Sequence, residues 1–195
     1  GTAAPQIVVT SKSAIYYDPF SAELGFSWQQ TPAFRHFLQV EYQAWSRYEI
    51  PMNLLSGAGS DGIAISDSKT PNITFKDIFI PKAAEEVTFG RWCLRAGYGY
   101  RPSIIKSSLS GGGNFLDPPK HMVNAGGGYE FLEFFGLKTP WKIDFNLSYH
   151  RLVTQKITKT EGNEFGTSGD TKIGAPGYEA GGSIYGGGLT LSLML

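Results

Sequence analysis

Short segments in which apolar and polar residues alternate dominate this sequence, and helical periodicity is almost absent. Apolar residues at every second position predict β-strands that have one apolar and one polar face. We identify eight such segments, at residues 6–16, 21–30, 35–50, 77–89, 92–102, 120–131, 141–150 and 179–195. Several run to about ten residues or more, longer than most strands, and about ten tilted residues cross the hydrocarbon core of a bilayer.

The stretch WCLRAGYGYRP, residues 92–102, shows the alternation clearly. Its even-numbered positions up to Tyr100 are apolar or aromatic, and its odd-numbered positions are arginine, glycine and one cysteine. Glycine on a water-exposed strand surface weakens the strand without any gain. Inside a narrow barrel, glycine leaves space for arginine and glutamate side chains. The pattern therefore favours an apolar face toward lipid and a polar face toward a barrel interior.

The connections between the segments fall into two length classes. Residues 31–34 and 89–91 make tight turns, whereas residues 50–77, 102–120 and 157–179 are long, polar and rich in glycine, serine, proline or aspartate. Short periplasmic turns at one end and longer extracellular loops at the other are typical of outer-membrane barrels. The connection YDPF at residues 17–20 breaks this pattern, because it is short where a long loop is expected.

Closure into a barrel removes the exposed edges of a sheet. We therefore expect an all-β fold in which residues 1–195 form a single domain, an antiparallel transmembrane β-barrel of about eight strands. The interior of such a barrel holds only its own side chains or one small ligand. The alternative is a soluble barrel that turns its apolar face inward and binds a lipophilic molecule.

Each face supplies candidate functional residues. Unpaired buried charges are costly, so we expect the charged residues of the polar face to fill the lumen as a charge network, with a proton or ion path as the alternative. This network comprises Glu23, Glu41, Arg95, Glu130 and Asp144. Aromatic residues gather near strand ends, as in the girdles of membrane proteins. The residues expected to face lipid or a neighbouring subunit are Trp28, Trp92, Leu94, Tyr98, Tyr100, Phe145, Tyr149 and Leu191.

Composition excludes several functions. Lys+Arg and Asp+Glu both total 17, so no net charge attracts nucleic acid. His36, His121 and His150 are scattered without metal-ligand spacing, and we expect no metal and no cofactor. No phosphate-binding glycine loop and no nucleophile elbow is found, so we expect no enzyme.

Four stretches, in order, also resemble the closing strands of the FadL family, outer-membrane transporters of long-chain fatty acids and other hydrophobic compounds: LRAGYGYRPSII, NFLDPPKHMVNAGGGYEF, KIDFNLSYHRLVTQKITK and GAPGYEAGGSIYGGGLTLSL. The upstream stretch FSAELGFSWQQTPAFRHFLQVEYQAWSRYEIP is similar to the same family. The resemblance spans nearly the whole chain but only about the C-terminal half of the family's fourteen-stranded barrel. The family's ligand pocket draws heavily on the other parts, so no ligand-binding residue is carried over.

The expected function follows from the pattern and the resemblance together. We expect a FadL-like barrel in a bacterial outer membrane that binds or handles membrane lipids or other hydrophobic molecules. Because the lumen of one narrow barrel would be plugged, we expect a homo-oligomer. A hydrophobic-compound uptake channel is the alternative, and a soluble lipophile-binding barrel is a further one. Nucleic acid is not an expected partner.

Overall fold

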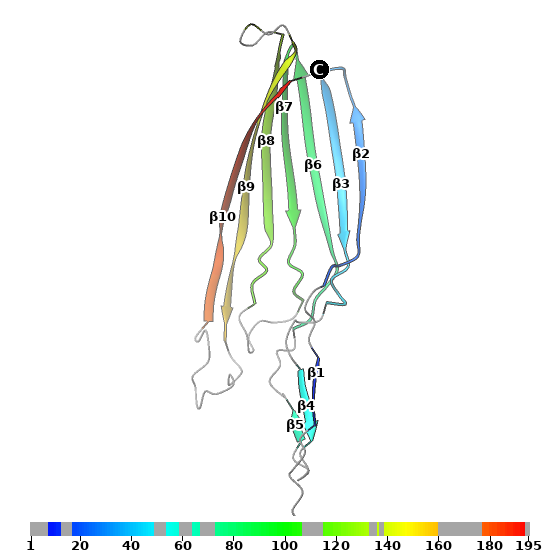
Figure 1. Ribbon diagram of the computed structural model, residues 1–195, viewed down its shortest axis with the longest axis vertical. Coiled ribbons are helices and arrows are strands. Elements are labelled where there is room, and N and C mark those ends of the chain that lie inside the picture. Colours follow the sequence, from blue (N-terminus) through cyan, green and yellow to red (C-terminus); the bar gives the residue numbers. More distant parts are fainter. Residues whose placement is uncertain are drawn as a thin grey trace, which may run out of the picture.

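The computed structural model describes residues 8–12, 17–48, 54–58, 64–66, 73–106, 115–132, 136, 139–159 and 177–193, with side chains for all of these except 8–12, 54–58 and 64–66. Seven long strands form one antiparallel sheet in the order β10-β9-β8-β7-β6-β3-β2 (Figure 1). These strands are β2 (Ser21–Gln29), β3 (Phe34–Gln43), β6 (Ile78–Phe89), β7 (Trp92–Arg101), β8 (Lys120–Phe131), β9 (Trp141–Thr158) and β10 (Gly177–Leu193). No helix among the described residues is long and apolar enough to cross a membrane.

One end of the sheet, which we call the turn end, carries the short connections (Figure 1). Between β2 and β3, the Thr31 hydroxyl accepts hydrogen bonds from the backbone N–H groups of Ala33 and Phe34. Between β6 and β7, Gly90 has a φ of 59°, a conformation that glycine adopts without steric cost. The long connections lie at the opposite end, which we call the loop end. The expected division into short turns and long loops is therefore present.

Strand register keeps the two expected faces separate, because residues directly opposite each other on neighbouring strands share a face. Leu94 on β7 lies between Val87 on β6 and Gly127 on β8, whereas Arg95 lies between Glu86 and Gly126. The apolar face is the side of the sheet that carries, with their register partners, Trp92, Leu94, Ala96, Tyr98 and Tyr100. The polar face is the side that carries, with their register partners, Cys93, Arg95, Gly97, Gly99 and Arg101.

The sheet is not closed, so the expectation of a closed eight-stranded barrel is wrong for the described residues. The strands β2 and β10 are its two edges, and no pairing joins them. An antiparallel sheet with an odd number of strands has edge strands that run in the same direction. With seven strands, β2 and β10 therefore cannot complete an antiparallel barrel by pairing with each other.

The missing eighth strand was expected at residues 6–16. Its described part, β1 (Val8–Lys12), instead pairs with β4 (Leu54–Ala58), which pairs with β5 (Ala64–Ser66) in a separate three-stranded sheet (Figure 1). The chain just before β2 is held elsewhere, because the Tyr17 hydroxyl donates to the Ala44 carbonyl at 2.8 Å. The Tyr17 ring also packs on Trp45 and Tyr48, at centroid distances of 5.8 and 5.3 Å.

Two other strand boundaries differ from the expected ones. The strand β3 ends at Gln43 rather than continuing to residue 50, because the chain turns where the Tyr48 N–H donates to the Trp45 carbonyl. The strand β9 continues beyond residue 150 to Thr158, because β10 pairs with it along almost its whole length. The ladder between them shifts register once, between Ala180 and Gly182.

A small apolar cluster closes the loop end of the polar face. Its buried members among the described residues are Phe75, Ile78, Ile80 and Ile104. Ile78 and Ile80 lie on the polar face of β6, opposite Gln43 and Glu41. Backbone hydrogen bonds from Lys76 to Ile104 and from Lys106 to Thr74 bring the other two members over them.

Candidate functional site

The apolar face exposes large hydrophobic side chains on all seven long strands. Leu24 on the edge strand β2 is 79% exposed, and Leu147 in the middle of β9 is 60% exposed. A contiguous apolar surface of this kind on a protein marks a contact with a partner or with a membrane. All eight residues expected to face lipid or a subunit lie on this face: Trp28, Trp92, Leu94, Tyr98, Tyr100, Phe145, Tyr149 and Leu191.

Aromatic residues form a band at each end of this face. At the turn end, the Trp92 and Tyr129 rings pack at 4.6 Å, next to Phe131. Toward the loop end, the Tyr149 and Tyr185 rings pack at 5.1 Å. Between these bands, the apolar face of β7 to β10 is aliphatic or glycine except for Phe145, for example at Ala96, Leu147 and Gly187. The row of Ala96 continues to Glu85 on β6 and His36 on β3, whose side chains lie 3.3 Å apart on the same face. Two aromatic girdles that flank an aliphatic band are typical of membrane-spanning barrels.

The polar face carries ion pairs that link neighbouring strands. The Glu41 carboxylate lies 2.8 Å from the Lys82 ammonium. The Glu86 carboxylate lies 2.7 Å from Arg95, which is in turn 4.0 Å from Asp144. Three of the five expected network residues therefore take part in ion pairs, in two separate groups.

A second cation completes the Asp144 group, since the Lys142 ammonium lies 3.1 Å from the Asp144 carboxylate. The structure shows no ion pair for Glu23 or Glu130 among the described residues. Glu23, on the edge strand β2, lies opposite the like-charged Glu41 on β3. Glu130 on β8 lies opposite Lys142 on β9. The sequence-based list omitted the partners Lys82, Glu86 and Lys142. Lys82 and Glu86 lie in the segment 77–89, whose alternation is the poorest of the eight, so their place on the polar face is only weakly indicated by the pattern.

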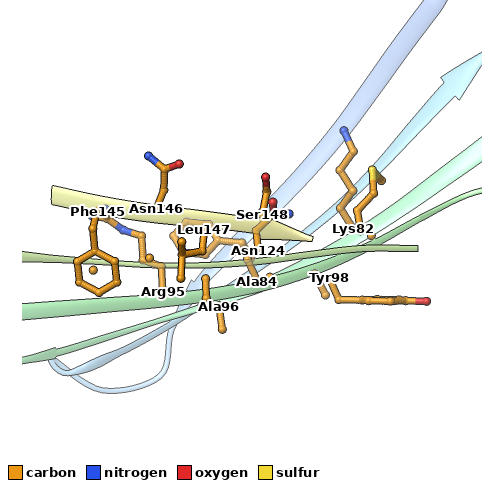
Figure 2. Close-up of a pocket in the computed structure, with 18 of the residues that line it drawn as sticks. Lys82, Ala84, Arg95, Ala96, Tyr98, Asn124, Phe145, Asn146, Leu147 and Ser148 are labelled. Atoms are coloured by element: carbon orange, nitrogen blue, oxygen red, sulfur yellow. The ribbon is translucent and has the colours of Figure 1, made fainter. Parts of the chain in front are cut away.

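A cavity of about 660 Å³ lies mainly on the polar face. Two thirds of the residues around it belong to that face, among them Gln39, Lys82, Arg95, Asn124, Asp144, Asn146 and Ser148. Figure 2 shows Lys82, Asn146 and Ser148 on one side of the strands and Ala96 and Phe145 on the other. The cavity wall has three cations, the Asp144 carboxylate and amides but, in the part of the chain described, no group of three metal-binding side chains.

Glycines on β10 leave room for two side chains of this wall. A Cβ atom at position 186 would stand 2.6 Å from the Ser148 hydroxyl, and one at position 188 would stand 2.9 Å from the Asn146 amide. Contacts this short require a neighbour to move. The polar-face glycines therefore leave room for the polar side chains of the adjacent strand.

At the loop end, one carboxylate ties two segments together. Asp77 accepts a hydrogen bond from the Ser46 backbone N–H at 2.8 Å and another from the Tyr42 hydroxyl at 2.7 Å. The Ser46 hydrogen bond, followed by that of Tyr42, lowers the pKa of the Asp77 carboxyl below its usual value. Asp77 therefore fixes the segment after β3 against the start of β6.

No protein-family model and no curated protein matches the chain. Among solved structures, the chain is similar to the crystal structure of a Pseudomonas aeruginosa FadL homologue, with a TM-score of 0.51 and 14% sequence identity. The similarity covers 89% of this chain and 34% of that chain, so this chain spans about a third of that protein's length. The seven-stranded sheet thus has the fold of part of a FadL homologue.

Proposed function

We propose that this chain forms part of the wall of a bacterial outer-membrane β-barrel that handles hydrophobic molecules or lipids. The observation that carries the proposal is the separation of an apolar and a polar face along the seven long strands, which the His36–Glu85 pair interrupts on β3 and β6. The apolar face would contact lipid, and the polar face would line the interior. The FadL-like fold supports this reading.

The strand lengths fit a membrane. The strand β7 has 10 residues. At about 3.3 Å per residue and a tilt of about 40°, a strand of this length spans about 25 Å along the membrane normal. This equals the height of the apolar band in outer-membrane barrels. The two aromatic bands would then lie at the two membrane surfaces.

The two edges restrict how the wall is completed. In lipid, the backbone N–H and C=O groups of β2 and β10 must find partners. Because β2 and β10 run in the same direction, a regular antiparallel barrel needs an odd number of additional strands between them. A second copy inserted in the same orientation would meet both edges with parallel strands. We therefore propose that any homo-oligomer forms through barrel walls rather than by closing this sheet.

Handling of a hydrophobic molecule is supported by the cavity on the interior side of the wall. Phe37 and Met122 give its lining apolar surface, and Lys82 belongs to the same lining. A cavity with apolar and charged lining suits a molecule with a long apolar part and a polar head.

Uptake of hydrophobic compounds is the second candidate function. The objection to it was the narrow lumen of an eight-stranded barrel, and the open seven-stranded sheet removes that objection. The soluble alternative has weaker support, because Leu24, Leu189 and Tyr185 are each more than 70% exposed on the apolar face.

Membrane fractionation and mass spectrometry test the proposal. Expressed in a Gram-negative host together with the strands that complete its barrel, the chain should partition with the outer membrane, require detergent for extraction and carry a hydrophobic molecule that organic solvent releases. A chain that remains monodisperse without detergent would overturn the membrane placement. A chain that inserts but carries no hydrophobic molecule, and gains none from added lipid, would overturn the handling function.

A further inference from the structure

A row of polar side chains crosses the apolar face at the loop end of β7 and β8 and continues onto β9 and β10, which extend further toward the loops. Tyr100 on β7, His121 on β8, Arg151 on β9 and Ser183 on β10 are consecutive register partners. The neighbouring row toward the membrane centre is Tyr98, Val123, Tyr149 and Tyr185, and the next is Ala96, Ala125, Leu147 and Gly187. The face therefore changes from aliphatic to polar within two rows.

Arg151 is the unusual member of this row. Its side chain is exposed, and its guanidinium donates to the Ser183 hydroxyl at a long 3.4 Å. Arg151 has no ion pair among the described residues, and Glu179, the nearest carboxylate along β10, lies four residues from Ser183, beyond the register shift. An arginine that faces lipid without an anionic partner is costly unless its head reaches the polar surface of the membrane.

The neighbours of Arg151 supply further hydrogen-bonding groups. The Tyr98 hydroxyl lies 2.7 Å from Nδ1 of His121, and the Tyr100 ring packs on the His121 ring at 5.0 Å. Because Nδ1 has this partner, Nε2 of His121 is the ring nitrogen that can serve a ligand. The hydroxyl groups of Tyr149 and Ser183, which lie 3.2 Å apart, are further hydrogen-bonding groups near Arg151.

We propose that Arg151 and His121, with the hydroxyl of Ser183, bind the phosphate of a lipid in the outer leaflet of the membrane. We call this the Arg151 site. A guanidinium matches phosphate with two parallel hydrogen bonds. The aromatic row directly below would pack on the acyl chains, and the loop end would place the phosphate at headgroup depth. The inference rests on the proposed membrane orientation of the sheet.

Native mass spectrometry of the full chain in detergent tests the site. The probe is dilauroyl phosphatidylglycerol, and dilauroylglycerol is the comparison lipid with the same chains but no phosphate. We expect the wild type to prefer the phosphate-bearing lipid, and R151Q to bind it about tenfold more weakly, because a hydrogen bond between charged groups is lost. H121Q should weaken binding to a smaller extent.

The matched control is K156Q, which removes one positive charge from an exposed position on the same strand, five residues beyond Arg151 and opposite Glu179. K156Q should bind the lipid as the wild type does. Equal binding by the wild type and R151Q, or an equal loss in K156Q, would overturn the site. Displacement of the lipid by millimolar inorganic phosphate would show a free-anion site instead.

Membrane insertion of each variant is measured separately by the heat-modified mobility of the folded protein in gels. If the wild type inserts and shows no preference for the phosphate-bearing lipid, the Arg151 site is wrong and the membrane placement stands. If the wild type does not insert at all, the proposed function fails and the site fails with it.

Discussion

Gly128 on β8 lies directly opposite Asp144 on β9, and a Cβ atom at position 128 would stand 2.5 Å from Oδ1 of Asp144. The same Cβ atom would stand 3.0 Å from Cε of Lys142. Glycine at this position therefore allows the Asp144–Lys142 ion pair to lie flat against the neighbouring strand. The glycine content of the polar face is a packing requirement of its charged side chains.

Replacing Gly128 by alanine should destabilise the protein by about 1–3 kcal/mol, because the added methyl group overpacks the ion pair. Urea unfolding of the inserted protein in lipid vesicles measures the change. Gly25→Ala is the matched control, since the nearest atom to a Cβ there is 4.0 Å away. If both variants lose the same stability, the crowding at position 128 does not matter.

The Glu86–Arg95 pair should be weakly coupled. Arg95 has half of its side chain exposed, and exposed ion pairs contribute about 0–1 kcal/mol. A double-mutant cycle with E86Q, R95Q and the double variant should give a coupling energy in this range. A coupling well above it would mean that the pair is more deeply desolvated in the complete barrel than in this sheet.

The Asp77 carboxylate predicts an acid-sensitive loop end. Its pKa is lowered in the folded protein by the Ser46 and Tyr42 hydrogen bonds, so its contribution to stability is present above the unfolded pKa of about 3.9. That contribution disappears as the pH falls through the lower, folded pKa. The variant D77N should therefore be less stable than the wild type at pH 7, and the difference should shrink below about pH 4.

Urea unfolding midpoints at several pH values provide the measurement for D77N. Asp18→Asn is the control, because Asp18 has no hydrogen bond among the described residues and lies at the same end of the sheet. A stability difference for D77N that does not change with pH would contradict the role of the charged carboxylate.

A charge should be tolerated better on the polar face than in the central row of the apolar face. Leu147 lies in that row on β9 and is 60% exposed, and Gln39 lies on the polar face of β3. L147R should lower the free energy of insertion into vesicles by about 2–4 kcal/mol, the cost of arginine at the bilayer midplane. Q39R should have a small effect, and similar costs for both variants would contradict the assignment of the faces.

Alternation along the chain was sufficient to predict the two faces. The apolar positions of WCLRAGYGYRP lie opposite apolar, aromatic or glycine residues of the neighbouring strands, except that Ala96 lies opposite Glu85 and Tyr100 opposite His121. The turn end and the loop end of the sheet could be predicted as well, because the short turns and the long loops differ strongly in length and composition. All eight residues expected on the outer surface consequently lie on one face.

Pairing partners could not be read from alternation. The segment at residues 6–16 was expected to be a wall strand, yet its residues 8–12 pair with β4, because a local sequence pattern does not specify which edge a strand joins. The ion pairs were missed for a related reason. Register sets whether Arg95 lies beside Glu86 or beside Glu130, and register is a property of the assembled sheet.

Spin-label accessibility along β9 tests the central claim most directly. With Cys93 replaced by serine, single cysteines at positions 143–148 are labelled in the full chain inserted in lipid vesicles, and collisions with oxygen are compared with collisions with a water-soluble nickel chelate. Oxygen, which concentrates in lipid, should contact the labels at Ile143, Phe145 and Leu147 and not those at Asp144, Asn146 and Ser148. An accessibility profile that lacks this two-residue alternation, or that reverses it, would contradict a membrane-spanning wall with its apolar face toward lipid.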